Sequence, residues 1–490
     1  MFNKKLFLLI ICSSILLLIV GYTSELSLGD EVLHYRFAKG IFNTGKRIVC
    51  DSLYDTGKPS GMFFISEPLW HILLALFSRL FGRISFHIAQ FYHTIYYALL
   101  ILFTYLLGKE LYGEKQGLCS ALIIATVPAV VAFSILFYLD IPATTLSVLC
   151  LLLIIKRKIL WSGIVLGLMY LTKRNSCFFV PAFLLLIFYQ NRPSLRAAIK
   201  NILYFVLPPL LFILPDFLWR ENNLKFNIAL NENGKQILIS NVGVFAGILD
   251  RLLRKGMREY MNSSLANPVD IVKYFGVVLL IGLLLYALLR VYSKKDVTLW
   301  LPVLCYFIFF CYIFNLVSDI RYLLPIVPLL SVISANTISN FLNKKWLKAL
   351  FILFCLIQFI STALYVRAKR QVPQEIKEGF AYLRENTPAD AIIIYPEYLI
   401  LELANRRFVW AGYLPTVIRD IFYSADNATI EKLLKSGNIS YIAIKKSRVF
   451  DDAKVRHFGG YPKSFVEKLP KLPFLKLVFD NKEMSIWKIN

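Results

Sequence analysis

Long apolar runs, separated mostly by short polar loops, recur through the first three quarters of the chain. Each run is close to the length that an α-helix needs to cross a hydrocarbon core of about 30 Å. The pattern predicts eleven membrane-spanning helices, at about residues 6–21, 86–107, 117–137, 140–155, 159–171, 177–189, 201–218, 271–292, 298–317, 321–341 and 347–366. The sequence therefore predicts a polytopic α-helical membrane domain over residues 1–366.

The hydropathy falls after Tyr365, and a pattern typical of soluble proteins begins. About 120 residues suffice for a small α/β domain, which we expect over residues 367–490. The periodicity predicts helices over 374–385 and 429–434 and strands over 391–395, 439–445, 474–479 and 484–489.

Two further polar stretches, residues 22–85 and 219–270, interrupt the apolar pattern. Within the first, residues 67–81 are apolar at helical spacing but too short for a full crossing. We interpret them as an interfacial helix with Arg79 and Arg83 on its polar side and end. A re-entrant segment is the alternative.

Composition supports this assignment, since 57% of the 490 residues are hydrophobic, only 18% are charged and the mean hydropathy is +0.60. Soluble proteins average about 25% charged residues. The net charge of +24 lies largely in short basic loops such as Lys156–Lys158 and Arg192–Lys200. That placement is the positive-inside signal, with attraction to anionic membrane lipids, and it argues against nucleic-acid binding.

The same signal sets the topology. With the N-terminus inside, the short basic loops lie in the cytoplasm, and residues 22–85, 219–270 and 367–490 lie outside. We expect a multi-pass protein of the bacterial cytoplasmic membrane with an external, periplasmic C-terminal domain. The eight cysteines show no CxxC spacing, so neither a disulfide framework nor a cysteine metal site is indicated.

Asp30 and Glu31 form an acidic pair at the outer end of the first span. Carboxylates at that depth are costly unless a cation or a hydroxyl needs them. We interpret Asp30 as a general base and Glu31 as a second carboxylate that binds an acceptor, a metal or a helix end. The alternative is that both stabilise the start of a helix near Glu31.

Asp140, Lys173 and Arg174 lie at predicted outer ends of spans. Asp140 is either functional or a helix cap before Pro142. Lys173 and Arg174 break the positive-inside trend, and two cations at the outer leaflet suit a lipid-linked phosphate. Snorkelling of both side chains to ordinary headgroups is the alternative.

Arg321 opens a late span, again at the predicted outer face. It either binds a phosphate or pairs locally with Asp319. Together these residue types suit transfer of a sugar from a polyprenyl phosphate. Because the departing phosphate is already a stable anion, the reaction needs one base and a set of cations but no general acid.

The chain resembles the GT-C superfamily of membrane glycosyltransferases, in particular the bacterial branch related to protein O-mannosyltransferases (GT39) and lipid A aminoarabinose transferases. Five weak motifs in family order carry the resemblance: Gly29-Asp30-Glu31 followed by Tyr35 and Ala38; Glu67-Pro68-Leu69-Trp70 through Leu80-Phe81-Gly82; Asp140; Gly163 to Lys173; and Arg321-Tyr322-Leu323-Leu324-Pro325.

The resemblance implies a GT-C fold and an inverting transfer from a polyprenyl-phosphate sugar to the hydroxyl of a lipid, glycan or protein acceptor. Asp30 would be the base, with Asp140 beside it, and Arg321 and Tyr322 would join Lys173 and Arg174 at the donor phosphate. Some relatives bind a divalent metal near their acidic residues, which leaves Asp30, Glu31 and Asp140 as the ligands if a metal is used.

The chain departs from the family at Ser66-Glu67-Pro68, where relatives often have Lys or His before a Pro pair. Lys58 before Pro59 is the substitute that the sequence offers for that phosphate contact. Two other activities remain alternatives: a flippase or transporter of lipid-linked sugars, and a polymerase or ligase that uses polyprenyl-diphosphate oligosaccharides. The absence of a visible internal repeat, and the gathering of polar residues at one face, favour the enzyme over a transporter.

Overall fold

The computed structural model describes residues 3–22, 29–45, 67–223, 228–230, 236–238, 268–289, 293–317, 320–397, 399–410, 416–424, 426–451 and 460–490. The chain divides into two compact units that are each discontinuous in sequence. The first, the membrane unit, comprises residues 1–23, 65–70 and 87–367. The second, the C-terminal unit, comprises residues 24–64, 71–86 and 368–490.

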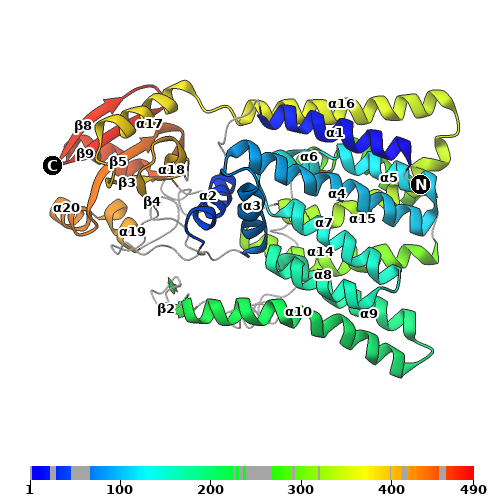
Figure 1. Ribbon diagram of the computed structural model, residues 1–490. Coiled ribbons are helices and arrows are strands. Elements are labelled where there is room, and N and C mark those ends of the chain that lie inside the picture. Colours follow the sequence, from blue (N-terminus) through cyan, green and yellow to red (C-terminus); the bar gives the residue numbers. More distant parts are fainter. Residues whose placement is uncertain are drawn as a thin grey trace. The chain divides into compact units, whose positions relative to one another are not determined.

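The membrane unit is helical (Figure 1). Its α-helices are α1 (Lys4–Tyr22), α4 (Phe86–Tyr112), α5 (Glu114–Thr126), α6 (Pro128–Ile135), α7 (Asp140–Ile155), α8 (Ile159–Thr172), α9 (Val180–Asn191), α10 (Leu195–Asn223), α12 (Pro268–Phe275), α13 (Val277–Leu289), α14 (Val297–Val317), α15 (Val327–Phe341) and α16 (Lys345–Lys369). Two 3₁₀ segments, η1 (Arg174–Phe179) and η3 (Ile320–Ile326), precede α9 and α15.

The described parts of all eleven predicted spans are largely helical, although the span predicted over 117–137 is broken between α5 and α6. Among the described residues, five helices are long and apolar enough to cross a membrane, and α5 with α6 makes a sixth if this pair, bent by 57°, is one span. Helices satisfy their own backbone hydrogen bonds, which is why apolar runs adopt them in lipid. The chain is thus a multi-pass membrane protein, and the count of eleven crossings stays a prediction.

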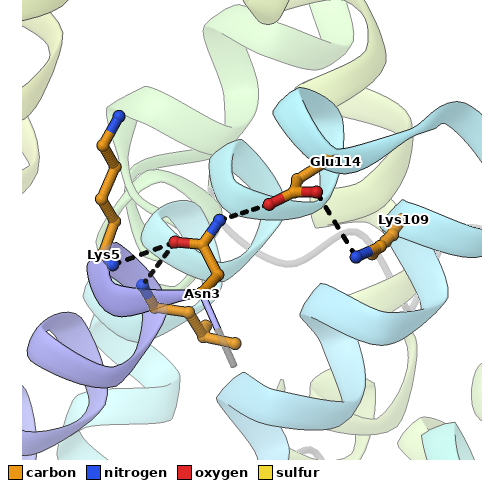
Figure 2. Close-up of polar contacts among 5 residues, drawn as sticks. Asn3, Lys5, Lys109 and Glu114 are labelled. Carbon is orange, nitrogen blue, oxygen red and sulfur yellow. Dashed lines mark hydrogen bonds and ion pairs between the residues drawn. The ribbon is translucent and has the colours of Figure 1, made fainter. Parts of the chain in front are cut away.

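Polar contacts fix the ends of several of these helices. Figure 2 shows Asn3 at the start of α1, where its side-chain oxygen accepts the backbone N–H of Lys5 at 2.9 Å and its amide donates to Glu114 at the start of α5. Glu114 also pairs with Lys109 of α4 at 3.4 Å. Because exposed helix ends carry unpaired N–H groups, this side-chain cap both completes α1 and ties it to the α4–α5 turn.

Helices α8 and α10 approach closely because glycines lie between them. A Cβ added at Gly163 would sit 2.7 Å from the carbonyl oxygen of Phe205, and one at Gly167 would sit 2.3 Å from the Phe212 ring. Small residues at such contacts are the usual basis of tight packing between helices in membranes. The Gly-rich span predicted over 159–171 therefore owes its glycines to packing.

The C-terminal unit contains a five-stranded sheet of order β4-β3-β5-β9-β8 (Figure 1). Its strands are β3 (Ile392–Tyr395), β4 (Arg407–Trp410), β5 (Ile439–Lys445), β8 (Leu475–Asp480) and β9 (Met484–Ile489). β3 pairs in parallel with β4 and β5, whereas β9 is antiparallel to both β5 and β8. Its helices include α17 (Gln374–Asn386), α18 (Ile400–Leu403), α19 (Thr416–Tyr423) and α20 (Asn427–Ser436).

Each face of this sheet carries its own apolar core. Phe380 of α17 and Tyr395 of β3 belong to one core, and Ile421 of α19 and Ile430 of α20 belong to the other. The predicted helices over 374–385 and 429–434 and the four predicted strands are all present. An α/β domain of this kind was predicted, but strand β4 and helices α18 and α19 were not.

Two helices from the first predicted loop belong to the C-terminal unit. These are α2 (Gly29–Thr44) and α3 (Leu69–Arg79), and α3 corresponds to the predicted interfacial helix. Val32 and Phe37 of α2 are buried in the same core as Phe380. The helix that begins with the acidic pair therefore shares a core with residues more than 330 positions later.

Candidate active site

Asp140 and Lys173 meet where α7 begins and α8 ends. Asp140 is the first residue of α7 and only 2% exposed, and Lys173 directly follows α8. The Lys173 ammonium lies 2.6 Å from Oδ1 of Asp140. A carboxylate at a helix N-terminus and a cation at a helix C-terminus are each favoured by the helix dipole, so the packing of α7 against α8 brings the pair together.

The second carboxylate oxygen of Asp140, Oδ2, is buried and has no hydrogen-bond partner among the described residues. A carboxylate oxygen in that position is costly unless something else binds it. Oδ2 is therefore the atom of this ion pair that is placed to accept a hydrogen bond from a hydroxyl group or to bind a cation.

Segment η3 adds two more of the predicted residues. Two cations contact the ring of Tyr322: the Lys173 ammonium is 4.7 Å and the Arg321 guanidinium 5.4 Å from its centroid. Arg321 also lies 5.0 Å from the Tyr138 ring, and Tyr274 donates a 2.9 Å hydrogen bond to its backbone carbonyl. Cation–π contacts of this kind hold the two cations beside an aromatic surface. We call Asp140, Lys173, Arg321 and Tyr322 the junction cluster.

Arg174, the neighbour of Lys173, contacts a different carboxylate. Its guanidinium lies 3.2 Å from Oε1 of Glu67 and 5.5 Å from the centre of the Tyr170 ring. Glu67 occupies the position at which the chain departs from the family pattern. Here the acidic side chain at that position neutralises one of the two predicted phosphate-binding cations.

Tyr306 is a residue that the sequence did not single out. It comes from α14, is fully buried, and its ring centroid lies 4.7 Å from that of Phe179. Its phenol is close enough to Asp140 and Tyr322 to interact with them electrostatically, and its hydroxyl has no hydrogen-bond partner among the described residues. An aromatic residue in an apolar run gives no sequence signal for such a position.

The acidic pair lies in the C-terminal unit. Asp30 is the second residue of α2, and its side chain lies outside the described residues, as does the whole of Lys58. Glu31 is fully buried, and its Oε2 lies 2.7 Å from the guanidinium of Arg370, which is also fully buried. Arg370 was not predicted, because the basic residues at 367–370 are explained equally well as the end of the last span.

No group of three or more His, Cys, Asp and Glu side chains within the described residues is arranged to hold a metal ion. Oδ2 of Asp140 is an open ligand oxygen, which suits a divalent cation. The Glu31 carboxylate fits a metal less well, because the Arg370 guanidinium already supplies its positive charge. Asp140 is thus the described acid best suited to this role.

Part of the sequence and the fold resemble those of known proteins. The family model for dolichyl-phosphate-mannose-protein mannosyltransferases matches residues 66–219. No curated protein matches the sequence. ArnT of Cupriavidus metallidurans, solved with undecaprenyl phosphate, is 11% identical with a TM-score of 0.65 and covers 98% of this chain and 97% of its own.

Two further solved structures share the fold. The oligosaccharyltransferase of Archaeoglobus fulgidus, solved with zinc and sulfate, is 16% identical, has a TM-score of 0.64, and covers 94% of this chain and 71% of its own. The mycobacterial arabinofuranosyltransferase AftD is 12% identical, has a TM-score of 0.53, and covers 98% of this chain but 40% of its own. The chain therefore has the GT-C fold of these proteins.

This result confirms the GT-C fold that the resemblance implied. The stretch that the family model matches, residues 66–219, includes Glu67, Asp140, Lys173 and Arg174. The roles of these four residues, and of Asp30, Glu31, Lys58, Arg321 and Tyr322, stay predictions.

Proposed function

We propose that this chain is a GT-C enzyme that transfers a sugar from a polyprenyl-phosphate donor to an acceptor hydroxyl at the outer face of the bacterial cytoplasmic membrane, with inversion at the anomeric carbon. The observation that carries the proposal is the junction cluster, in which two cations contact Tyr322 and one of them pairs with a carboxylate whose second oxygen has no partner among the described residues. Similar proteins solved with undecaprenyl phosphate and with dolichol phosphate support a lipid-phosphate donor.

In this proposal Asp30 takes the proton from the acceptor hydroxyl. The resulting oxygen attacks the anomeric carbon, and the bond from that carbon to the phosphate oxygen breaks with its electrons going to the phosphate. Lys173 and Arg321 hold the departing polyprenyl phosphate, which needs no proton to leave. Asp140 keeps Lys173 in place through Oδ1. Its Oδ2, which has no partner among the described residues, accepts a hydrogen bond from a hydroxyl of the donor sugar or binds a divalent cation.

The C-terminal domain would lie outside the membrane and assist access of the acceptor. An acceptor peptide bound to the Archaeoglobus fulgidus oligosaccharyltransferase shows that a protein of this fold takes a protein acceptor. For this chain, lipid, glycan and protein hydroxyls are the acceptor classes to test.

The test uses purified protein in lipid vesicles, a panel of labelled undecaprenyl-phosphate hexoses, and membrane extract as acceptor. We expect a labelled product with the anomeric configuration opposite to that of the donor. Asp30→Asn should lower turnover about 10²- to 10⁴-fold, as loss of a positioned base does, without weakening the binding of undecaprenyl phosphate.

Asp426→Asn, which removes an exposed carboxylate of the C-terminal unit, is the matched control and should turn over normally. Near-normal turnover of Asp30→Asn would exclude Asp30 as the base. Movement of the donor across the vesicle membrane without a new glycosidic bond would instead indicate a flippase.

A further inference from the structure

Helix α2 is attached to the rest of the C-terminal unit along an apolar face. Val32 is fully buried and Phe37 is 5% exposed, and both pack in the core that contains Phe380 and Leu401. Leu33 packs against the same core. This contact holds the helix against the unit, but apolar packing alone leaves some freedom to slide or rotate.

A buried ion pair fixes the first turn of α2. Glu31 and Arg370 are 339 positions apart in sequence, 2.7 Å apart in space, and both fully buried. Arg370 directly follows α16, and its guanidinium also lies 5.2 Å from the centre of the Phe86 ring. Such a pair adds little net stability, because desolvating two charges costs about as much as their attraction returns. The ion pair does, however, fix the position of the Glu31 carboxylate relative to the Arg370 guanidinium.

A second set of ion pairs fixes the later part of the helix. Arg36 lies 3.0 Å and Lys39 lies 3.5 Å from the carboxylate of Glu402 in α18. Anchors at residues 31 and 36–39 restrain the helix at two points along its axis. Since Asp30 is bonded to Glu31, the first anchor also fixes the backbone from which the Asp30 side chain extends.

We propose that Glu31 and Arg370 are positioning residues: their buried ion pair holds the start of α2 on the C-terminal unit so that Asp30 is presented for catalysis. In this inference, which rests on the proposed role of Asp30 as base, Glu31 binds neither substrate nor metal. A displacement of about 1 Å at a reacting group costs on the order of 10² in rate, so loosening this anchor should lower turnover even if the protein stays folded.

The experiment compares three variants in the transfer assay. Glu31→Leu with Arg370→Met removes both charges together. Arg370→Lys keeps the positive charge but lacks the planar guanidinium group. Glu31→Arg with Arg370→Glu exchanges the two charges of the pair. The exposed pair of Glu431 and Lys435 supplies the control, as Glu431→Leu with Lys435→Met. Unfolding temperature, turnover, KM for the donor and affinity for undecaprenyl phosphate are measured for each.

We expect the apolar double variant to unfold near the wild-type temperature, to bind undecaprenyl phosphate normally, and to lose about 10²-fold in turnover with little change in KM. Arg370→Lys should show a smaller loss of turnover, and the reversed pair should recover part of it. The control pair should change nothing. A merely structural role would move the unfolding temperature and not turnover alone.

Three results would overturn the inference. The first is a folded apolar double variant with wild-type turnover. The second is a turnover defect of that variant that added Mn²⁺ or Mg²⁺ repairs, which would make Glu31 a metal ligand. The third is an Arg370→Lys protein that folds and loses donor affinity instead of turnover. Failure of Asp30 as the base is seen separately, as normal turnover of Asp30→Asn.

Discussion

Removal of Lys173 should destabilise the membrane unit strongly, because it leaves a buried charge without its partner. The Asp140 side chain is 2% exposed, one of its oxygens is bound by Lys173 at 2.6 Å, and the other has no partner among the described residues. Breaking a buried ion pair on one side costs about 3–5 kcal/mol. Lys173→Met should therefore shift the folding equilibrium by about two to three and a half powers of ten.

The double variant Asp140→Asn with Lys173→Met separates this loss from the loss of function. With the charge of Asp140 also gone, most of the 3–5 kcal/mol should return, so the double variant should be far more stable than Lys173→Met. Donor affinity should stay low in both, because the cation proposed to bind the phosphate is missing from both.

Unfolding can be followed with a fluorogenic thiol reagent. Cys119, Cys150 and Cys355 are buried in the membrane unit and should react when it opens, whereas the exposed Cys12 and the partly exposed Cys177 and Cys305 contribute the background. Equal stability of Lys173→Met and the double variant would refute the idea that Lys173 compensates a buried carboxylate. Recovery of donor affinity in the double variant would refute its role at the phosphate.

Three further predictions concern other contacts. Arg406 donates five hydrogen bonds around the end of α17, and Arg406→Met should cost about 2–4 kcal/mol of unfolding free energy, measured by chemical denaturation. Asn3→Ala removes the cap of α1 and should cost about 1 kcal/mol in the same measurement. Hydrogen bonds from the Thr429 hydroxyl and from the N–H groups of Ala428 and Thr429 lower the pKa of Asp426, so its stabilising effect should be complete above the unfolded value of about 3.9 and decline as pH falls below it. The stability difference between the wild type and Asp426→Asn should narrow accordingly as the pH falls below about 3.9.

The sequence predicted the helices well because hydropathy reports an element directly. All eleven apolar stretches are helical, and strands β5 and β9 were predicted to the residue. Local periodicity is enough for such elements, since a helix or a buried strand is recognisable from its own residues. Strand β4 is only four residues long and gave no comparable signal.

The junction cluster was predicted in part, because topology alone places the ends of spans together. Asp140, Lys173, Arg321 and Tyr322 were expected at one membrane face, and the structure brings them into contact. The ion-pair partners of Arg174 and Glu31 could not be predicted from the sequence. Both pairs join residues more than 100 positions apart, and charge pattern does not say which of many carboxylates and cations will meet.

The first loop shows the same limit. A helix starting near Glu31 was the alternative interpretation of the acidic pair, and α2 does begin at Gly29. Its apolar face could not reveal that it would share a core with residues after the last span, because an amphipathic pattern specifies a buried face and not the surface that covers it.

The long separation between Glu31 and Arg370 has a consequence for biogenesis. At a synthesis rate of about 5–20 residues per second, Arg370 leaves the ribosome roughly 17–70 s after Glu31. During that interval the ion pair between Glu31 and Arg370 cannot form, so the start of α2 lacks this anchor. Formation of the Glu31–Arg370 pair is thereby tied to synthesis of the C-terminal unit, and we expect a nascent chain arrested before residue 370 to be enzymatically inactive.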